Sequence, residues 1–115
     1  AREVESEIQV TIEQNTFICK IDAVFDVPEG DKTLPGKTIE IVDWKTGEPP
    51  KTDEEIAERA LQLALYKMAY SLRHNIPEQQ IAVCLYYVGH DEVLRPEVLN
   101  IEQVKAKWRE VLDSF

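Results

Sequence analysis

Asp43 and Lys45 stand one residue apart at the end of an apolar stretch, directly before Thr46-Gly47. In an extended strand, residues i and i+2 project from the same face, so these two side chains are expected to lie together. A carboxylate in this position can hold a hard cation through oxygen. The ammonium beside it can act on an attacking water and stabilise charge on a phosphate. This pair of residues therefore suits phosphodiester hydrolysis.

A second carboxylate, Asp22, belongs to the preceding apolar stretch. We expect it on the face opposite an apolar set at period 2, namely Phe17, Cys19, Ile21, Ala23 and Phe25. The loop over residues 28–37 is long enough to fold the two stretches into an antiparallel pair. Asp22 and Asp43 then come within reach of one Mg²⁺ ion. Spacing alone leaves a second interpretation open, because such residues also form solvated ion pairs or cap turns.

Three strands are predicted before the first helix, over residues 4–12, 16–27 and 38–45, from their alternating apolar pattern. The helix is expected to begin at a cap on Thr52 or Asp53 and to run to about Arg73. Its predicted core face is a set of residues that share one arc at 100° per residue: Ala57, Ala60, Leu61, Ala64, Leu65, Met68 and Leu72.

The remaining residues add a buried strand over 80–88, a possible short strand over 93–98 and a last helix over 101–112 capped by Asn100. The element order is β-β-β-α-β-(β)-α, which predicts an α/β fold with a mixed sheet flanked by helices. The chain has 115 residues, which suits a single domain. Within the strand over 80–88, Tyr86 and Tyr87 are interpreted as residues with a core ring and a surface hydroxyl.

The formal net charge is −9, which argues against a free-standing DNA binder, because affinity for nucleic acid depends largely on Lys and Arg. Residues 22–58 alone hold 11 acids and only four bases. Metal ions or a basic partner domain would have to offset this surface. The two cysteines lie in apolar stretches, which indicates buried thiols and a reducing, cytoplasmic location, with no iron–sulfur cluster. No run is long and apolar enough for a membrane span.

The segments KIDAVF, EIVDWKTG and QLALYKMAY, in this order, resemble the PD-(D/E)XK nuclease superfamily. The resemblance is to the RecB-like nuclease domain of bacterial recombination-repair helicases and of CRISPR-associated exonucleases. It covers about residues 4–88 and rests on an Ile-Asp strand, a D-x-K-T-G strand and a Q-x-x-x-Y helix. It implies a restriction-endonuclease-like fold.

The resemblance also implies roles for four residues around the predicted metal site. Asp22 matches the first metal-binding aspartate, and Asp43 matches the second acidic ligand. Lys45 matches the catalytic lysine. The carbonyl of Trp44 stands where the family often supplies one more metal oxygen.

On the helix, Gln62 and Tyr66 match the Q-x-x-x-Y pair, which implies that they face DNA near the active site. They are one turn apart, on a flank of the apolar arc that also holds Arg59, Tyr70 and Arg73. Arginine can contact phosphate, and tyrosine can stack on bases. Under the alternative interpretation, Tyr66 packs at the margin of the core and Gln62 is solvated.

Several features depart from the family pattern. Ile21 replaces the proline before the first aspartate, and Cys19 and Lys20 stand where a glycine is usual. The upstream helix that carries a further acid or histidine is absent from this chain, and neither Glu3 nor Glu5 is assigned to that role. The cysteines that bind a cluster in some relatives are also missing.

The function expected from these observations is that of a Mg²⁺-dependent deoxyribonuclease of DNA recombination and repair, with Mn²⁺ able to substitute and with exonuclease favoured over endonuclease activity. Residues 1–115 are expected to be a C-terminal nuclease fragment of a larger helicase–nuclease whose motor feeds it single-stranded DNA. The chain contains no G-x-x-x-x-G-K-[ST] motif, so ATP would bind elsewhere. The alternatives are a catalytically silent fragment that binds DNA or protein, and an acidic interaction domain.

Overall fold

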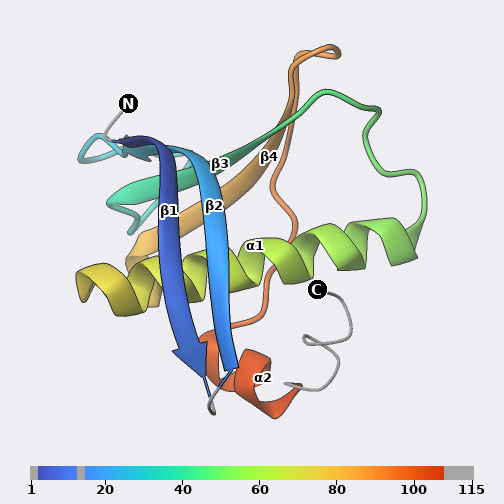
Figure 1. Ribbon diagram of the computed structural model, residues 1–115. Helices are drawn as coiled ribbons and strands as arrows, with labels where there is room; N and C mark the ends of the chain where they lie inside the picture. The colour runs from blue at the N-terminus through green and yellow to red at the C-terminus, as the bar shows by residue number, and fades with distance from the viewer. Residues whose placement is uncertain (1–2, 13–14, 108–115) are drawn as a thin grey trace.

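The computed structural model describes residues 3–12 and 15–107 (Figure 1). They form five strands and two α-helices in the predicted order. The elements are β1 (Glu3–Ile12), β2 (Asn15–Asp26), β3 (Ile39–Lys45), α1 (Asp53–His74), β4 (Ile81–Tyr87), β5 (Glu92–Leu94) and α2 (Ile101–Ala106), with a short 3₁₀ helix over Glu78–Gln80 before β4. The α/β fold predicted from the sequence is confirmed.

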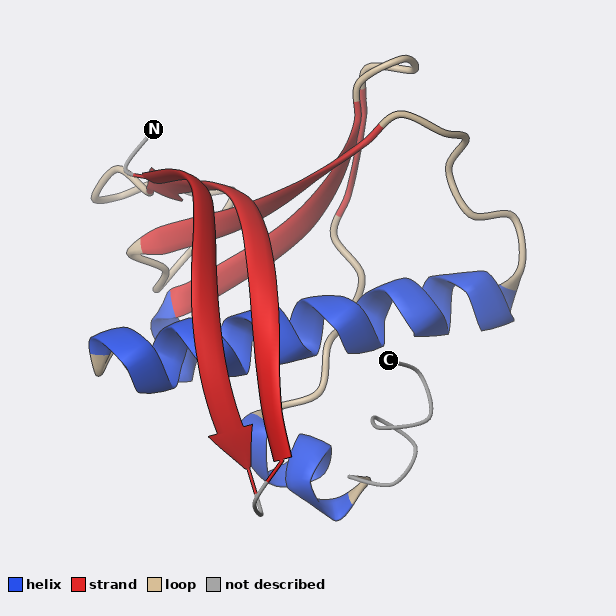
Figure 2. Cartoon of the chain, viewed as in Figure 1, coloured by secondary structure: helices blue, strands red, loops and turns tan. Residues whose placement is uncertain are grey.

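The strands form one mixed sheet in the order β1-β2-β3-β4-β5. Only β3 and β4 pair in parallel, and the other neighbours are antiparallel. A parallel pair needs a crossover connection, and α1 supplies it between β3 and β4. Figure 2 shows how the β1–β2 hairpin lies on one side of α1 while β3 and β4 lie on the other, and α1 contacts all four strands. The sheet therefore curls around the helix.

Because the sheet curls, α1 is buried on nearly every side through its middle, from Leu63 to Ser71. The strands cover most of this surface, and α2 covers the rest, since Val104 packs with Ala64, Leu65 and Met68. The predicted core face is correct at its centre but wrong at its ends. Ala57 is exposed and Leu72 is 55% exposed, because one straight arc cannot describe a helix that is wrapped by its sheet.

The alternation predicted for β2 is also partly wrong. Cys19, Ile21 and Val24 all belong to the core that faces α1, whereas Ala23 packs on the opposite face of the sheet. Strict period 2 cannot place Ile21 and Val24 on one side. The strand therefore changes the face it presents between these two residues. The side chain of Phe17 lies outside the described part of the structure.

The face of the sheet away from α1 carries several exposed apolar side chains, among them Phe25, Trp44 and Val93. They border a shallow hollow of about 310 Å³, to which neither described helix contributes a residue. An ion pair between Arg95 Nε and Glu40 Oε2, at 2.9 Å, crosses this face.

The two helices begin at the predicted capping residues. The Thr52 hydroxyl accepts a hydrogen bond from Glu55 N–H at 3.2 Å and begins α1, and Asn75 ends it in the left-handed region with φ of 56°. Asn100 and Gln103 form a capping box at the start of α2. The part of the last predicted helix beyond residue 107 lies outside the described residues. No described helix has the length and apolar character needed to cross a membrane.

Candidate active site

The two aspartates predicted to share a metal ion come from neighbouring strands at the same level of the sheet. The antiparallel pairing of β2 with β3 reaches Ala23 opposite Val42, and the next position in that register puts Asp22 opposite Asp43. At this level the backbone N–H of Trp44 donates a hydrogen bond to the side chain of Asp22, at 2.9 Å from Oδ2, and not to a backbone carbonyl of β2. This bond fixes Asp22 against β3, so the predicted juxtaposition of the two acids is present.

Asp43 lies deep in the site and is only 5% exposed. Its Oδ2 atom lies 3.0 Å from Lys45 Nζ, so the acid and the amine point to the same face as predicted. Burial raises the pKa of Asp43 to about 6; a hydrogen bond with Asp22 adds to this rise, and Lys45 opposes it. The site therefore disfavours the charged form of this carboxyl relative to water.

Tyr66 and Gln62 of α1 cover these acids. Tyr66 is 7% exposed, and its pKa is raised by burial first and then by the charges of Asp43, Cys19 and Asp22. A side-chain hydrogen bond with Gln62 acts in the opposite direction. The phenol of Tyr66 thus faces the aspartates, as its predicted place near the active site requires. Its ring is buried in the core, which agrees with the alternative interpretation that Tyr66 packs at the core margin, and its contact with DNA stays a prediction.

Two other residues on the predicted flank of α1, Arg59 and Tyr70, lie at different distances from the aspartates. Arg59 is exposed one turn before Gln62, and its charge lowers the pKa of Tyr87 at the end of β4, although burial makes the net shift of Tyr87 upward. Arg59 therefore lies over the site. Tyr70 belongs to the core near the other end of the helix, 1% exposed, with its ring centroid 4.2 Å from that of His74. Stacking of Tyr70 on DNA is therefore excluded.

Three buried side-chain atoms in the described part of the structure have no hydrogen-bond partner: Asp43 Oδ2, Gln62 Oε1 and Tyr87 Oη. The first of them has only its ion pair with Lys45. Buried polar atoms are usually satisfied, since leaving one unpaired costs about 1–3 kcal/mol. All three belong to the set of residues that surrounds the aspartates. This concentration is typical of a site arranged for a ligand rather than for stability.

The donor set suits a hard divalent cation. Mg²⁺ keeps several of its waters and binds through one or two carboxylates together with phosphate oxygens, which Asp22 and Asp43 can accommodate. The described residues hold no cluster of three or more His, Cys, Asp or Glu side chains, so the protein would supply few ligands. The Trp44 carbonyl remains a predicted ligand. It is expected at the same strand edge as the Trp44 N–H, which faces Asp22.

Comparison with known protein families gives one match that covers residues 1–115, to the PD-(D/E)XK nuclease superfamily. The chain belongs to this superfamily. Its mixed five-stranded sheet with two helices agrees with the restriction-endonuclease-like fold of the family. Membership indicates a nuclease domain with DNA as substrate, in a superfamily that hydrolyses phosphodiester bonds and typically uses divalent metal ions. A search of curated proteins finds no match.

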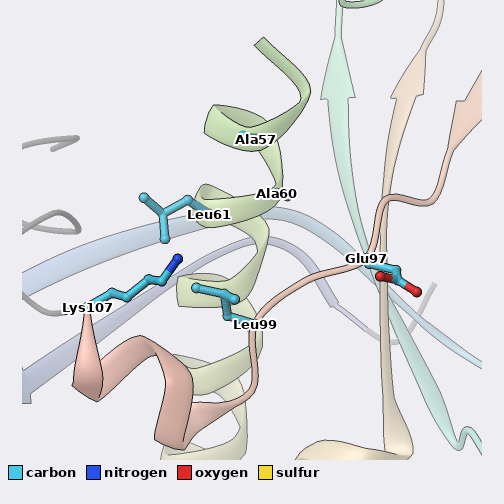
Figure 3. Close-up of a pocket in the computed structure, with 6 residues that line it drawn as sticks. All are labelled: Ala57, Ala60, Leu61, Glu97, Leu99 and Lys107. Atoms are coloured by element: carbon cyan, nitrogen blue, oxygen red, sulfur yellow. The ribbon is translucent and has the colours of Figure 1, made fainter. Parts of the chain in front are cut away.

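A separate pocket of about 280 Å³ lies between α1 and the segment that leads into α2. Figure 3 shows Leu61, Leu99 and Lys107 pointing toward one another across it, while Glu97 points away. None of the residues that line it is an aspartate of the nuclease site. Four of its six lining residues are aliphatic and it holds a single acid, Glu97, which points away, so its lining does not suit a metal ion.

Sequence reasoning missed one residue that lies beside Asp43 and Lys45, Tyr87. Its expected surface hydroxyl is wrong, because the residue is 2% exposed and its hydroxyl is buried. Tyr87 pairs with Lys45 in the parallel register of β3 and β4. The signal available in the sequence was its position at the end of an apolar strand, since ligands bind beyond the carboxyl ends of parallel strands.

Proposed function

We propose that this PD-(D/E)XK domain is a Mg²⁺-dependent deoxyribonuclease of the RecB-like type that degrades single-stranded DNA as an exonuclease. The observation that carries the proposal is the Asp22–Asp43–Lys45 cluster. In it, Asp22 accepts a hydrogen bond from Trp44 N–H, and Asp43 pairs with Lys45 at 3.0 Å. The D-x-K-T-G strand and the Q-x-x-x-Y helix support the RecB-like assignment.

Asp22 and Asp43, with the Trp44 carbonyl, would hold the metal ion, which when bound supplies Lewis-acid charge stabilisation. The ion pair with Asp43 keeps the Lys45 ammonium on the reacting face of β3. From there Lys45 orients the attacking water and stabilises negative charge on the phosphate. Gln62, beside Tyr66, positions the DNA strand. The exposed guanidinium of Arg59 binds backbone phosphate at the edge of the site.

The biological role that we propose is DNA recombination and repair in the cytoplasm, within a larger helicase–nuclease whose motor delivers a single strand. The net charge of −9 supports a need for such a partner domain. A surface this acidic repels the DNA backbone outside the site, and a basic track elsewhere in the parent protein would overcome that repulsion.

The test is degradation of single-stranded DNA in Mg²⁺ or Mn²⁺ by the wild-type chain and by the Asp43→Ala and Lys45→Ala variants. We expect each substitution to lower the rate by about 100-fold or more. Glu48→Ala and Lys51→Ala are matched controls, because this acid and base form an exposed ion pair at 3.1 Å outside the site. Activity that is equal in all five proteins would reject the nuclease proposal.

A second candidate is a catalytically silent nuclease-like module that binds DNA or another protein. The scarcity of acidic ligands favours it, since the described residues bring together no third acid, cysteine or histidine beside the two aspartates. This candidate predicts DNA binding at low salt in EDTA without cutting in any metal. The absence of binding under those conditions would count against a DNA-binding module.

A further inference from the structure

Tyr87 occupies a position in the site that neither the sequence motifs nor the proposed mechanism uses. It ends β4 and is 2% exposed, so its ring is part of the core that faces α1. Its register partner on β3 is Lys45. Neighbouring strands lie about 4.8 Å apart, and paired residues project from the same face, so the phenol stands beside the lysine.

The hydroxyl of Tyr87 lies between groups of opposite charge. The Arg59 guanidinium of α1 and the Asp43 carboxylate of β3 both act on it electrostatically. Arg59 also forms a weak side-chain hydrogen bond with the hydroxyl, but its geometry leaves this buried atom without a well-formed partner. A buried tyrosine hydroxyl usually finds a partner. Here the poorly bonded hydroxyl lies near Arg59 and on the strand position beside Lys45, and two cationic side chains suit an anionic oxygen.

We infer that the Tyr87 hydroxyl donates a hydrogen bond to a phosphate oxygen of the DNA backbone held between Lys45 and Arg59. The inference rests on the proposed nuclease function and adds a substrate-binding residue to it. It accounts for the burial of a polar atom whose bond to Arg59 is poorly formed. It also explains why a tyrosine, rather than an apolar residue, stands at the end of a strand that is otherwise apolar from Ile81 to Leu85.

The test is the Tyr87→Phe variant of the full chain, which keeps the ring and removes only the hydroxyl. Among the described residues this hydroxyl makes only a poorly formed bond, to Arg59, so we expect the melting temperature to change by no more than about 2 °C. We expect kcat/KM on single-stranded DNA to fall by about 10- to 100-fold, as for a lost hydrogen bond to a charged group. Tyr86→Phe is the matched control, since Tyr86 Oη bonds Asp91 at 2.6 Å, away from the aspartates, and its kcat/KM should stay within about twofold.

The possible results distinguish failure of the Tyr87 contact from failure of the proposed nuclease function. Wild-type kcat/KM in Tyr87→Phe, together with an inactive Asp43→Ala, overturns the Tyr87 contact and leaves the nuclease assignment intact. A melting temperature lowered by more than about 2 °C in Tyr87→Phe shows that the hydroxyl serves the fold, and it also overturns the contact. A wild-type chain that does not cut DNA, or an Asp43→Ala variant that cuts equally well, overturns the nuclease proposal and the Tyr87 inference with it.

Discussion

The ionisation of Asp43 links the stability of the domain to its proposed chemistry. A carboxylate with 5% exposure is poorly solvated, and the adjacent Asp22 adds a second negative group. Lys45 offsets part of this cost at 3.0 Å. A bound cation would offset more of it. The metal-free protein is therefore expected to be less stable at neutral pH than its packing alone would allow.

This cost predicts a pH dependence of stability that can be measured with EDTA present. The pKa of Asp43 is about 6 in the folded protein, and it is expected to return to the ordinary value of 3.8 when the chain unfolds. Between about pH 4 and about pH 6 the folded protein therefore keeps a proton on Asp43 that the unfolded chain has lost. The contribution of Asp43 to the free energy of unfolding should fall as pH rises from about 4 to about 6, by on the order of 3 kcal/mol, and stay constant above. Urea denaturation of wild type and Asp43→Asn across this range measures it.

Asp43→Asn isolates the effect because every other titrating group is shared by the two proteins. The variant should match wild type near pH 4 and become the more stable of the two by pH 7. A difference between the two proteins that does not change with pH would show that Asp43 ionises as freely in the fold as in the unfolded chain.

Single residues also show how far sequence reasoning reached into the site. Asp22, Asp43 and Lys45 could be placed together because period 2 within a strand and antiparallel pairing are local rules. Tyr87 could not be placed, since its neighbour Lys45 depends on the parallel register set by the crossover through α1. Burial of Tyr66 depends equally on tertiary packing, which no spacing within the helix contains.

Among the elements, α1 brings the residues predicted to contact DNA to the strand ends. One face of the helix carries three of them at helical spacing: Arg59, Gln62 and Tyr66. Arg59 lies near Tyr87 of β4, and Tyr66 lies near Asp22 of β2 and Asp43 of β3. The start of the helix should therefore affect both stability and the site. Thr52 fixes that start through its bond to Glu55 N–H at 3.2 Å.

Loss of this cap should destabilise α1. Thr52→Ala should lower the free energy of unfolding by about 1 kcal/mol, because Glu55 N–H loses its side-chain acceptor. Thr52→Ser keeps an acceptor oxygen and should stay within about 0.5 kcal/mol of wild type. Urea denaturation of the three proteins compares them. Equal stability of the alanine and serine variants would show that the cap contributes nothing to α1.

The elements themselves were largely predictable, and their curvature was not. Apolar alternation and capping residues located the strands and the start of each helix, since both signals are local. The curl of the sheet around α1 is a collective result of strand twist and packing. For this reason the buried side of α1 was assigned too narrowly, and the change of face between Ile21 and Val24 in β2 was missed. β5 ends at Leu94, before Pro96, which cannot donate to a strand ladder.

The charge of the whole molecule sets how it can meet DNA. With a net charge of −9, most of its surface repels a polyanion, and contact must depend on a few cations near the site. Among the described residues, Arg59 and Lys45 are cations that the structure places there. Binding of this chain alone to single-stranded DNA should therefore be weak and should release few counterions.

The salt dependence of binding tests this view of the molecule. Each phosphate contact on a single strand contributes about −0.7 to the slope of log K against log salt, so Arg59→Gln should make the slope shallower by about that amount. Arg73→Gln is the matched control, about 21 Å further along the axis of α1, and should leave the slope unchanged. Fluorescence anisotropy of a labelled oligonucleotide provides the measurement. Equal slopes for the two variants would contradict a phosphate contact by Arg59.

The central claim, that Asp22 and Asp43 together hold one divalent ion, is tested most directly by titrating Mn²⁺ into the DNA-free protein and detecting the bound ion by electron paramagnetic resonance. We expect wild type to bind Mn²⁺ and Asp22→Asn and Asp43→Asn each to weaken binding by at least about 10-fold. Asp91→Asn, an exposed acid bonded to Tyr86, should bind as wild type does. Wild-type affinity in either the Asp22 or the Asp43 variant would contradict a shared metal site.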